Sequence, residues 1–300
     1  LDRTQPWDIV TSTPLRMVFP ILSLVLSGVA LLAGLPLNGY VIFVNSCRMG
    51  RTASAVWYLN RAVADFLFII FLPFRFIFIL SLDRAKILNN TITSLHMFSS
   101  AFLLTALSVD RCILVTHPEW TRNHRTPRLA FMILMGLWAL SLGFSLRYGD
   151  LWESLLSPDS ISTNVPLDEG KVKAAVAIQF LVGFLIPLAL ILIPTVYIVL
   201  AAKLRWNRLI QSTKPLNILL GLIPTFFLCW LPYHVFSFLL ISPKYPLSFL
   251  ITETFACVLT YFSSCLNPIF YLTMDKEFLK YQQRARNPQT TDNLVPELDE

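Results

Sequence analysis

The sequence predicts an all-α membrane protein, a bundle of seven transmembrane helices with a short amphipathic eighth helix. Hydrophobic residues make up 55% of the 300-residue chain and charged residues only 14%, whereas soluble domains carry about 25% charged residues. The mean hydropathy is +0.62. A transmembrane helix needs roughly 20 predominantly apolar residues, and stretches of that length recur along the chain. The predicted spans are residues 17–44, 55–80, 87–116, 129–148, 173–203, 214–241 and 248–272.

Lysine and arginine gather at one end of the predicted spans, which identifies that end as cytoplasmic. They are Arg48, Arg51, Arg122, Arg125, Arg128, Lys203, Arg205, Arg208, Lys214, Lys276, Lys280, Arg284 and Arg286. We therefore predict a plasma-membrane protein with an extracellular N-terminal segment at 1–16 and a transmembrane domain at 17–272. Residues 273–286 are predicted to lie among membrane lipids as the amphipathic eighth helix, and residues 287–300 form a disordered cytoplasmic tail. The net charge of +6 favours contact with anionic lipids over nucleic acid.

Asp65 lies in the middle of the second span, where an ionisable residue is costly and faces the bundle interior. Ser100, Ser264 and Asn267 place polar side chains at a similar depth. Two interpretations are open: these groups cage an allosteric sodium ion, or they share a water-mediated network without an ion. Arg61 precedes Asp65 by one turn on the same face. It either pairs with Asp65 and displaces sodium, or snorkels toward the inner interface. No other cofactor is expected.

A set of short motifs follows in order along the chain. They are Asn38-Gly39, Asn60 with Asp65, Asp110-Arg111-Cys112, Trp138, Pro187, Cys229-Trp230-Leu231-Pro232 and Asn267-Pro268-Ile269-Phe270-Tyr271. In this order and spacing they resemble the rhodopsin-like (class A) G-protein-coupled receptors. Residues 117–126, which read His-Pro-Glu-Trp-Thr-Arg-Asn-His-Arg-Thr, resemble the chemoattractant branch, meaning formyl peptide receptors and the prostaglandin and orphan receptors near them.

The resemblance implies a signalling role for the cytoplasmic motif. Arg111, held by neighbouring Asp110 in the inactive state, is expected to turn toward the C-terminal helix of a heterotrimeric G protein when the sixth span moves outward. This is a population shift between two packings. Pro118, in the second inner loop, belongs to the same G-protein activation set.

The resemblance also implies moving parts in the sixth and seventh spans. Pro232 removes a backbone hydrogen bond and kinks the sixth span, and Trp230 lies two residues before it, where a ligand can press on it. Asn267 and Pro268 loosen the seventh span and let Tyr271 swing inward. For Trp230 and Pro232 the alternative interpretation is ordinary packing and a static kink.

The chain departs from the resembling family in several places. The family usually has a disulfide on the outer face, but all five cysteines lie in spans or on the cytoplasmic side, so we expect no structural disulfide. Thr195 stands where the family has a tyrosine, and Tyr197 follows it by two residues. Both departures raise the alternative of altered or absent signalling.

A ligand pocket is expected in the outer half of the bundle, with apolar walls and a few polar groups. Arg75 predicts an anionic ligand group, such as a peptide C-terminus or a fatty-acid carboxylate; the alternative is a structural pair with Glu253. The predicted walls also contain Met97, Tyr233, His234, Phe238 and Tyr261. His234 is either a ligand contact or a core histidine with a satisfied hydrogen bond.

The identity of the ligand does not follow from the resemblance. The formyl-binding acid and arginines of the resembling receptors correspond to Ser94, Ala175 and Gln179, none of which retains the charge. A formylated peptide is therefore not expected, although Ser94 and Gln179 remain candidate pocket residues.

The sequence favours a receptor over other classes. Its four histidines have no metal-ligand spacing and no Gly-rich phosphate loop occurs, so an enzyme is not expected. Asn89 begins a glycosylation sequon, and Thr290 and Thr291 offer a thin basis for arrestin binding. The leading hypothesis is a receptor that binds an extracellular anionic peptide or lipid and activates an inhibitory-type G protein. The alternatives are a non-signalling decoy or degenerate receptor and a small-solute transporter or channel.

Overall fold

The computed structural model describes residues 13–47, 52–74, 83–156, 169–204, 216–240 and 246–274, with side chains omitted near several helix ends. Seven helices in these ranges are long and apolar enough to cross a membrane, and the predicted seven-helix fold is confirmed. The elements are α2 (Thr13–Cys47), α3 (Ala53–Ile70), α5 (Asp83–Thr116), α6 (Pro118–His124), α7 (Pro127–Leu156), α9 (Glu169–Phe180), the π-helical turn η1 (Leu181–Leu185), α10 (Ile186–Leu204), α11 (Asn217–Leu240) and α12 (Pro246–Met274). The segments α9, η1 and α10 run on without a break and form the fifth span.

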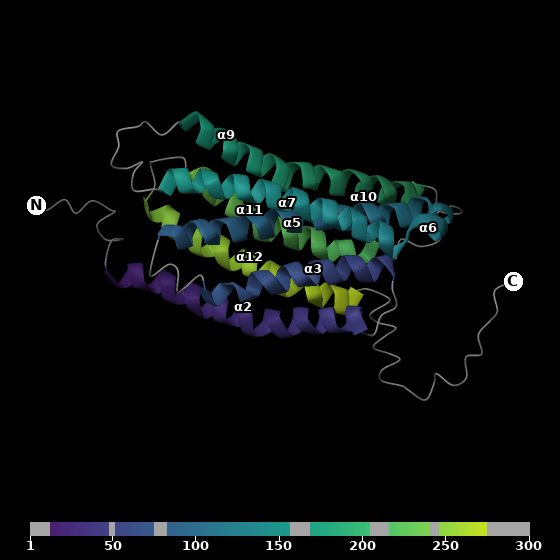
Figure 1. Cartoon of the computed structure of the whole chain (residues 1–300), viewed down its shortest axis with the longest axis horizontal. Coiled ribbons are helices and arrows are strands. Elements are labelled where there is room, and N and C mark those ends of the chain that lie inside the picture. Colours follow the sequence, from purple (N-terminus) through teal and green to yellow (C-terminus); the bar gives the residue numbers. More distant parts are fainter. Residues whose placement is uncertain are drawn as a thin grey trace, which may run out of the picture.

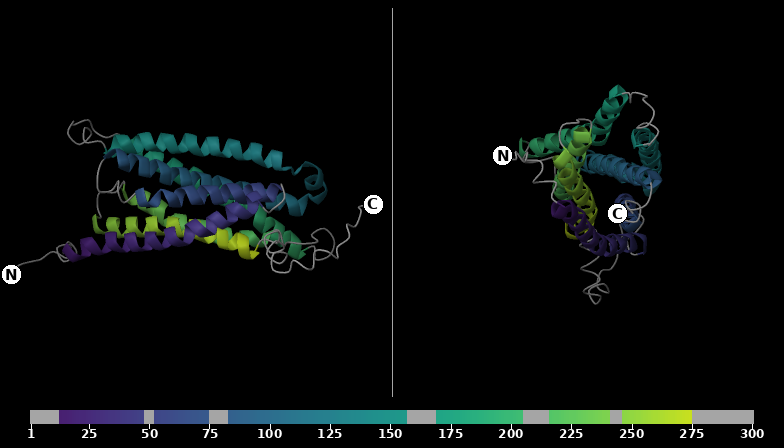
Figure 2. Two further views of the ribbon diagram at one scale, coloured as in Figure 1. Left: turned by 60° about the horizontal axis from the view of Figure 1, so that its bottom comes forward. Right: turned by 90° about the vertical axis from the view of Figure 1, so that its left-hand side faces the viewer.

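The helices lie side by side along one long axis (Figure 1). Helix α5 contacts α3, α7, α10 and α11, so it is the central helix of the bundle. Helix α2 packs between α3 and α12, and the turned view shows this neighbourhood from another side (Figure 2). The short helix α6 lies at the same end of the bundle as the last turns of α12, which is the end predicted to be cytoplasmic (Figure 1).

The helices follow from a requirement of the bilayer, which offers no hydrogen-bond partners, so each spanning segment must satisfy its own backbone. Hydroxyl side chains add local bonds within the turns; Ser108 donates to the carbonyl of Leu104 at 2.8 Å. Prolines mark starts and kinks: Pro127 begins α7, while Pro232 and Pro268 lie inside α11 and α12.

Tight packing joins α11 to α12 in the half of the bundle that is predicted to be cytoplasmic. Gly221 of α11 lies against the ring of Phe270 of α12, and a Cβ at this position would overlap that ring. The glycine therefore permits a close approach of the sixth and seventh spans, the two elements whose relative movement the sequence predicts.

Some predicted boundaries differ from the structure. Helix α2 begins at Thr13, inside the segment 1–16 predicted to precede it, and α7 continues to Leu156, beyond the predicted end at 148. Helix α6 was not expected in the second inner loop; Pro118 at its first turn favours a helix start there. The eighth helix and the tail fall almost entirely outside the described residues, so these two assignments stay predictions.

Candidate functional site

A buried polar cluster surrounds Asp65 in the middle of the bundle. One carboxylate oxygen, Oδ2, accepts hydrogen bonds from Asn267 Nδ2 at 2.9 Å and from Arg61 Nε at 3.3 Å. The other, Oδ1, lies 2.9 Å from His96 Nε2. Because an ionised carboxylate only accepts hydrogen bonds, His96 is the donor in this contact. Side chains of α3, α5 and α12 therefore meet at a single carboxylate.

Arg61 turns inward and does not snorkel. Its side chain is only 7% exposed, and Nη1 donates to the backbone carbonyl of Ser100 at 2.8 Å. The snorkelling interpretation is therefore wrong, and the pairing with Asp65 is what the structure shows. The i, i+4 spacing on one helix places the two side chains together, and burial makes their pairing obligatory because an isolated charge there is costly.

The other side chains proposed for the sodium cage take different roles. Ser264 Oγ lies 3.1 Å from His96 Nε2, while Ser100 Oγ has no hydrogen-bond partner among the described residues. The atoms that reach Asp65 are nitrogens, of which one belongs to a cation. A sodium ion requires oxygen ligands, and the arginine already supplies a positive charge at this carboxylate.

His96 was not recognised from the sequence as a functional residue. Its ring stacks on Phe68 with centroids 3.8 Å apart, and it lies 5.4 Å from the ring of Trp230. His96 thus joins the Asp65 cluster to the sixth span. A signal was present, because His96 precedes Ser100 by four residues and therefore shares its helix face.

Trp230 lies between the Asp65 cluster and the aromatic residues of the outer half. It is fully buried, and its ring centroid is 5.6 Å from that of Tyr233. Its indole nitrogen has no acceptor among the described residues. Pro232 follows within the same helix, α11. Trp230 therefore lies two residues before Pro232 within one helix, the sixth span.

At the end of the bundle predicted to be cytoplasmic, one expectation is wrong. Asp110 was predicted to hold Arg111, but its two carboxylate oxygens accept from Arg125 Nε and Nη2, both at 2.8 Å. Arg111 instead donates to Ser54 Oγ at 3.2 Å and to the hydroxyl of Tyr58. The reason is geometric: α6 brings Arg125 back beside α5, and its planar guanidinium binds a carboxylate with two parallel hydrogen bonds.

Ser54 and Tyr58 link this end to the seventh span. Ser54 Oγ also accepts from Arg125 Nη2 at 2.9 Å, so one hydroxyl contacts both arginines. The ring of Tyr58 lies 4.8 Å from that of Tyr271, which is buried. Tyr271 follows Pro268 by three residues in α12. By contrast, Tyr197 is 70% exposed on the outside of α10.

In the outer half, several predicted ligand residues come together. Gln179 Nε2 lies 3.5 Å from Met97 Sδ and 3.4 Å from the hydroxyl of Tyr233. Phe180 contacts both His234 and Phe238 through edge-to-face ring packing. Among the described residues, three buried polar atoms here have no hydrogen-bond partner: Ser94 Oγ, Gln179 Oε1 and His234 Nε2. Because buried polar atoms usually have partners, these three are available to a ligand.

Other predicted residues fall elsewhere or outside the description. Tyr261 packs on Phe68, with centroids 5.0 Å apart, in a second core cluster with α2 and α3 residues. Arg75 lies outside the described residues. Glu253 and Asn89 lie in described helices, but their side chains are outside the description. Their predicted roles are therefore not tested.

These features are those of a seven-helix membrane receptor. The chain has seven helices that can span a membrane, a polar cluster at their centre and Arg111 at one end of the third span. The chain belongs to the rhodopsin family of seven-transmembrane receptors, because residues 37–271 match the family described as "7 transmembrane receptor (rhodopsin family)". The chain is thus a multi-pass plasma-membrane receptor of the G-protein-coupled type.

The similar proteins identify the chemoattractant-like branch. N-formyl peptide receptor 3 of Pongo pygmaeus is 32% identical over 86% of this chain and 81% of its own length. Chemerin-like receptor 1 of Homo sapiens is 36% identical over 82% of this chain and 72% of its own length. Chemerin-like receptor 1 of Mus musculus is 34% identical over 94% of this chain and 81% of its own length. These relatives are receptors and not enzymes, as the sequence predicted.

Proposed function

We propose that this receptor binds an extracellular anionic peptide or lipid and activates an inhibitory-type heterotrimeric G protein. One observation carries the proposal, a continuous series of contacts from the outer aromatic residues to Arg111. Trp230 contacts His96, and His96 binds Asp65. Asp65 binds the amide of Asn267, one turn before Tyr271. Tyr271 packs on Tyr58, whose hydroxyl accepts from Arg111.

This series gives a ligand a physical route to the cytoplasmic end. Each member comes from a different helix than its neighbour, except Asn267 and Tyr271, so a shift of α11 or α12 changes several contacts at once. A ligand that presses on Trp230 acts on the His96 ring and thereby on the Asp65 cluster. The ligand then favours one of two packings to the extent that it binds that packing more tightly.

The anionic character of the ligand rests on Arg75, which remains a sequence-based expectation. The described residues of the predicted ligand pocket favour a ligand with its own polar groups, since Ser94, Gln179 and His234 each hold a side-chain atom without a partner among the described residues. These three side chains are neutral donors and acceptors. The proposal that the ligand is anionic therefore rests on Arg75 alone. The pairing of Arg75 with Glu253 is the competing proposal.

The proposed orientation in the membrane rests on the distribution of Lys and Arg, which gather at the end of the bundle that contains α6. With α6 and Arg122, Arg125 and Arg128 in the cytoplasm, the N-terminus lies outside, and the G protein meets Arg111 from the α6 side. The inhibitory G-protein type is proposed from the resemblance of the second inner loop to chemoattractant receptors. Arrestin and inner-leaflet lipids are proposed partners at this end.

We further propose that Arg61 takes the place of the allosteric sodium ion considered above. The guanidinium is 3.3 Å from Asp65, and His96 and Asn267 occupy the remaining carboxylate positions. A built-in cation makes the Asp65 cluster independent of external sodium. Replacing Arg61 with leucine reopens the site to the ion.

The test is nucleotide exchange on an inhibitory-type G protein in membranes that carry the receptor, compared with Arg111→Ala. Ligand-stimulated or basal exchange that disappears in Arg111→Ala supports the proposal. The matched control is Arg147→Ala, since Arg147 is an exposed arginine of α7 far from the end of the bundle that carries α6. Exchange that persists in Arg111→Ala contradicts the proposed role of this residue.

One observation favours a second candidate, a receptor that binds ligand without signalling. Tyr197 is exposed on the outer face of α10, and Thr195 donates to the carbonyl of Ile191 within its own helix. The fifth span therefore offers no tyrosine toward Arg111 from these positions. Saturable ligand binding at the cell surface without exchange on any G-protein type would select this alternative.

A further inference from the structure

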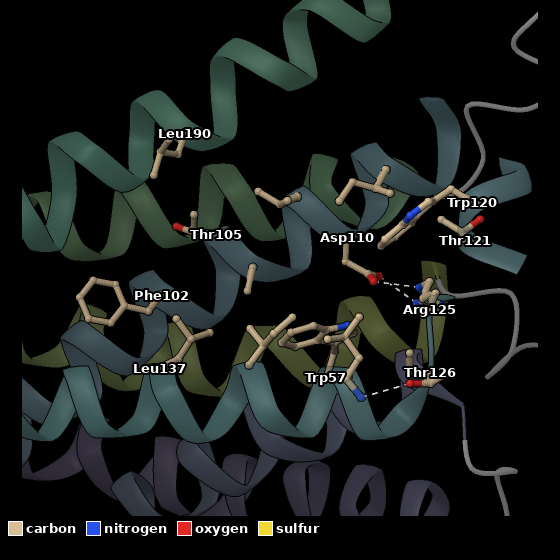
Figure 3. Close-up of a pocket in the computed structure, with 17 residues that line it drawn as sticks. Trp57, Phe102, Thr105, Asp110, Trp120, Thr121, Arg125, Thr126, Leu137 and Leu190 are labelled. Atoms are coloured by element: carbon tan, nitrogen blue, oxygen red, sulfur yellow. Dashed lines mark hydrogen bonds and ion pairs between the residues drawn. The ribbon is translucent and has the colours of Figure 1, made fainter. Parts of the chain in front are cut away.

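A cavity of about 360 Å³ lies outside the Asp65 cluster, between α3, α5, α6 and α7 in the cytoplasmic half of the bundle. Its two ends differ in chemistry (Figure 3). Phe102 and Leu137 lie at one end, while Asp110, Arg125 and Trp120 lie at the other. The cavity therefore changes from apolar to polar along its length, as an amphiphilic molecule does.

The mouth of the cavity is continuous with the surface that faces the bilayer. Val109, Ile133 and Leu190 contribute to the lining and are 40%, 43% and 51% exposed. All three lie in helices long and apolar enough to span the membrane. An occupant can therefore enter sideways from the inner leaflet, with its apolar part already among hydrocarbon.

The dimensions of the cavity fit a single chain. Phe102 and Asp110 are eight residues apart on α5, which corresponds to about 12 Å along the helix axis. With a volume of about 360 Å³, the cavity is at the small end of ligand pockets and is suited to one acyl chain rather than to the two chains of a phospholipid.

The charges of the lining select an uncharged head group. Arg125 is the cation of the lining, and Asp110 binds it through two hydrogen bonds at 2.8 Å. A carboxylate or phosphate placed beside this pair would lie against Asp110 and would compete with it for Arg125. A cationic head group would have to displace Arg125. The closed pair therefore disfavours ions of either sign.

One polar atom in the lining needs an acceptor. The indole nitrogen of Trp57 is turned toward the polar end of the cavity (Figure 3) and has no hydrogen-bond partner among the described residues. Trp57 itself is only 5% exposed. Indole N–H is a donor only, and tryptophan in such a place usually finds a partner. An ester carbonyl at the base of an acyl chain supplies that acceptor.

From these observations we infer that the cavity between α3, α5, α6 and α7 is a binding site for an uncharged single-chain acyl ester of the inner leaflet, a monoacylglycerol in chemical class. The chain lies toward Phe102 and Leu137. The ester carbonyl accepts from Trp57, and the hydroxyl groups lie near the Asp110 and Arg125 pair. The site is separate from the ligand pocket of the outer half and does not depend on the proposed extracellular agonist.

The first test is photo-crosslinking of the whole receptor in phosphatidylcholine nanodiscs that contain a monoacylglycerol with a diazirine on its chain. We expect adducts concentrated on α7 at Ile133 and Leu137, and their loss when unlabelled monoacylglycerol is added. Ala106→Phe fills the cavity from α5 and should reduce these adducts about tenfold. The control Leu220→Phe enlarges a side chain that is 68% exposed on α11, away from the cavity, and should leave them unchanged.

The second test does not require Ala106→Phe to fold. The affinity of the acyl ester is compared with that of its alkyl ether, which lacks the carbonyl acceptor, in the native receptor and in Trp57→Phe. We expect the ester to bind about 2- to 10-fold more tightly than the ether in the native receptor, and equally tightly in Trp57→Phe. If Trp57→Phe still binds the ester more tightly than the ether, the proposed hydrogen bond to Trp57 is wrong.

Several outcomes overturn the proposal. Adducts spread evenly over the lipid-facing helices, or unchanged in Ala106→Phe, identify annular lipid only. Displacement of the probe by a free fatty acid or by a sterol at lower concentrations than monoacylglycerol contradicts the uncharged single-chain assignment.

Discussion

Within the part of the chain that the structure describes, two carboxylate–arginine pairs lie at different depths, one at the centre of the bundle and one at the end predicted to be cytoplasmic. In the central pair, Asp65 is 0% and Arg61 7% exposed. In the edge pair, Asp110 is 11% and Arg125 17% exposed, with shorter contacts of 2.8 Å. The edge pair has the better hydrogen-bond geometry, yet breaking the central pair should cost more stability. Burial removes water as a substitute partner, so the consequence of breaking a pair depends more on depth than on distance.

The pairs also differ in how they can move. The central pair lies within one helix, α3, so a movement of other helices changes its neighbours and not the pair itself. The edge pair joins α5 to the segment after α6, and Ser54 of α3 contacts both Arg125 and Arg111. It is therefore suited to opening when the cytoplasmic end rearranges. Asp65 and Arg61 are therefore suited to a structural role, and Asp110 and Arg125 to a switch.

The largest expected effect comes from breaking the central pair. Arg61→Leu or Asp65→Asn alone should lower the free energy of unfolding by about 3–5 kcal/mol, because each leaves one buried group without its charged partner. The double variant should recover most of this loss. Thermal unfolding of the purified receptor in detergent, arranged as a double-mutant cycle, measures the coupling. Additive losses in the double variant contradict the buried pair.

Breaking the edge pair should cost less. Arg125→Ala should lower the free energy of unfolding by about 1.5–3 kcal/mol, since it removes charged hydrogen bonds at a site that water can partly reach. Arg125→Lys should recover only part of it, because lysine cannot form the two parallel bonds. The same unfolding measurement checks the order. If Arg125→Ala lowers the free energy of unfolding more than Arg61→Leu does, hydrogen-bond geometry matters more than burial for these two pairs.

Sodium should affect the Asp65 carboxylate only when Arg61 is absent. The native receptor should unfold at the same temperature in sodium chloride and in choline chloride of equal ionic strength. Arg61→Leu should gain about 1 kcal/mol of stability when the sodium concentration is about five times its dissociation constant. The control is Arg61→Leu with Asp65→Asn, which lacks the carboxylate and should show no gain. A sodium effect in the native receptor contradicts the proposal that Arg61 replaces the ion.

The smallest effect is expected at Tyr58. Tyr58→Phe removes the hydroxyl that accepts from Arg111 but keeps the ring that packs on Tyr271, so stability should fall by only about 0.5–1.5 kcal/mol. Nucleotide exchange should change more than stability, because Arg111 loses one of its anchors. Tyr40→Phe, on the outer side of α2 and 42% exposed, is the matched control. Equal exchange in the two variants would show that the Tyr58 hydroxyl does not hold Arg111.

The sequence predicted the seven spans, the family and the motifs at Arg111, Trp230 and Tyr271. It did so because hydrophobicity is read along the chain, and a span needs only length and apolar composition. It also placed Arg61 beside Asp65, since both lie on one helix, although it could not choose between pairing and snorkelling.

The packing of the helices against one another establishes which partners meet across helices. It brought Arg125, and not Arg111, to Asp110, and it placed His96 between Asp65 and Trp230. It likewise separated Tyr261 from the other predicted pocket residues. Such contacts join residues up to 235 positions apart, as Cys265 and Ala30 are. They depend on the rotation and depth at which helices pack, and no local pattern in the chain specifies either quantity.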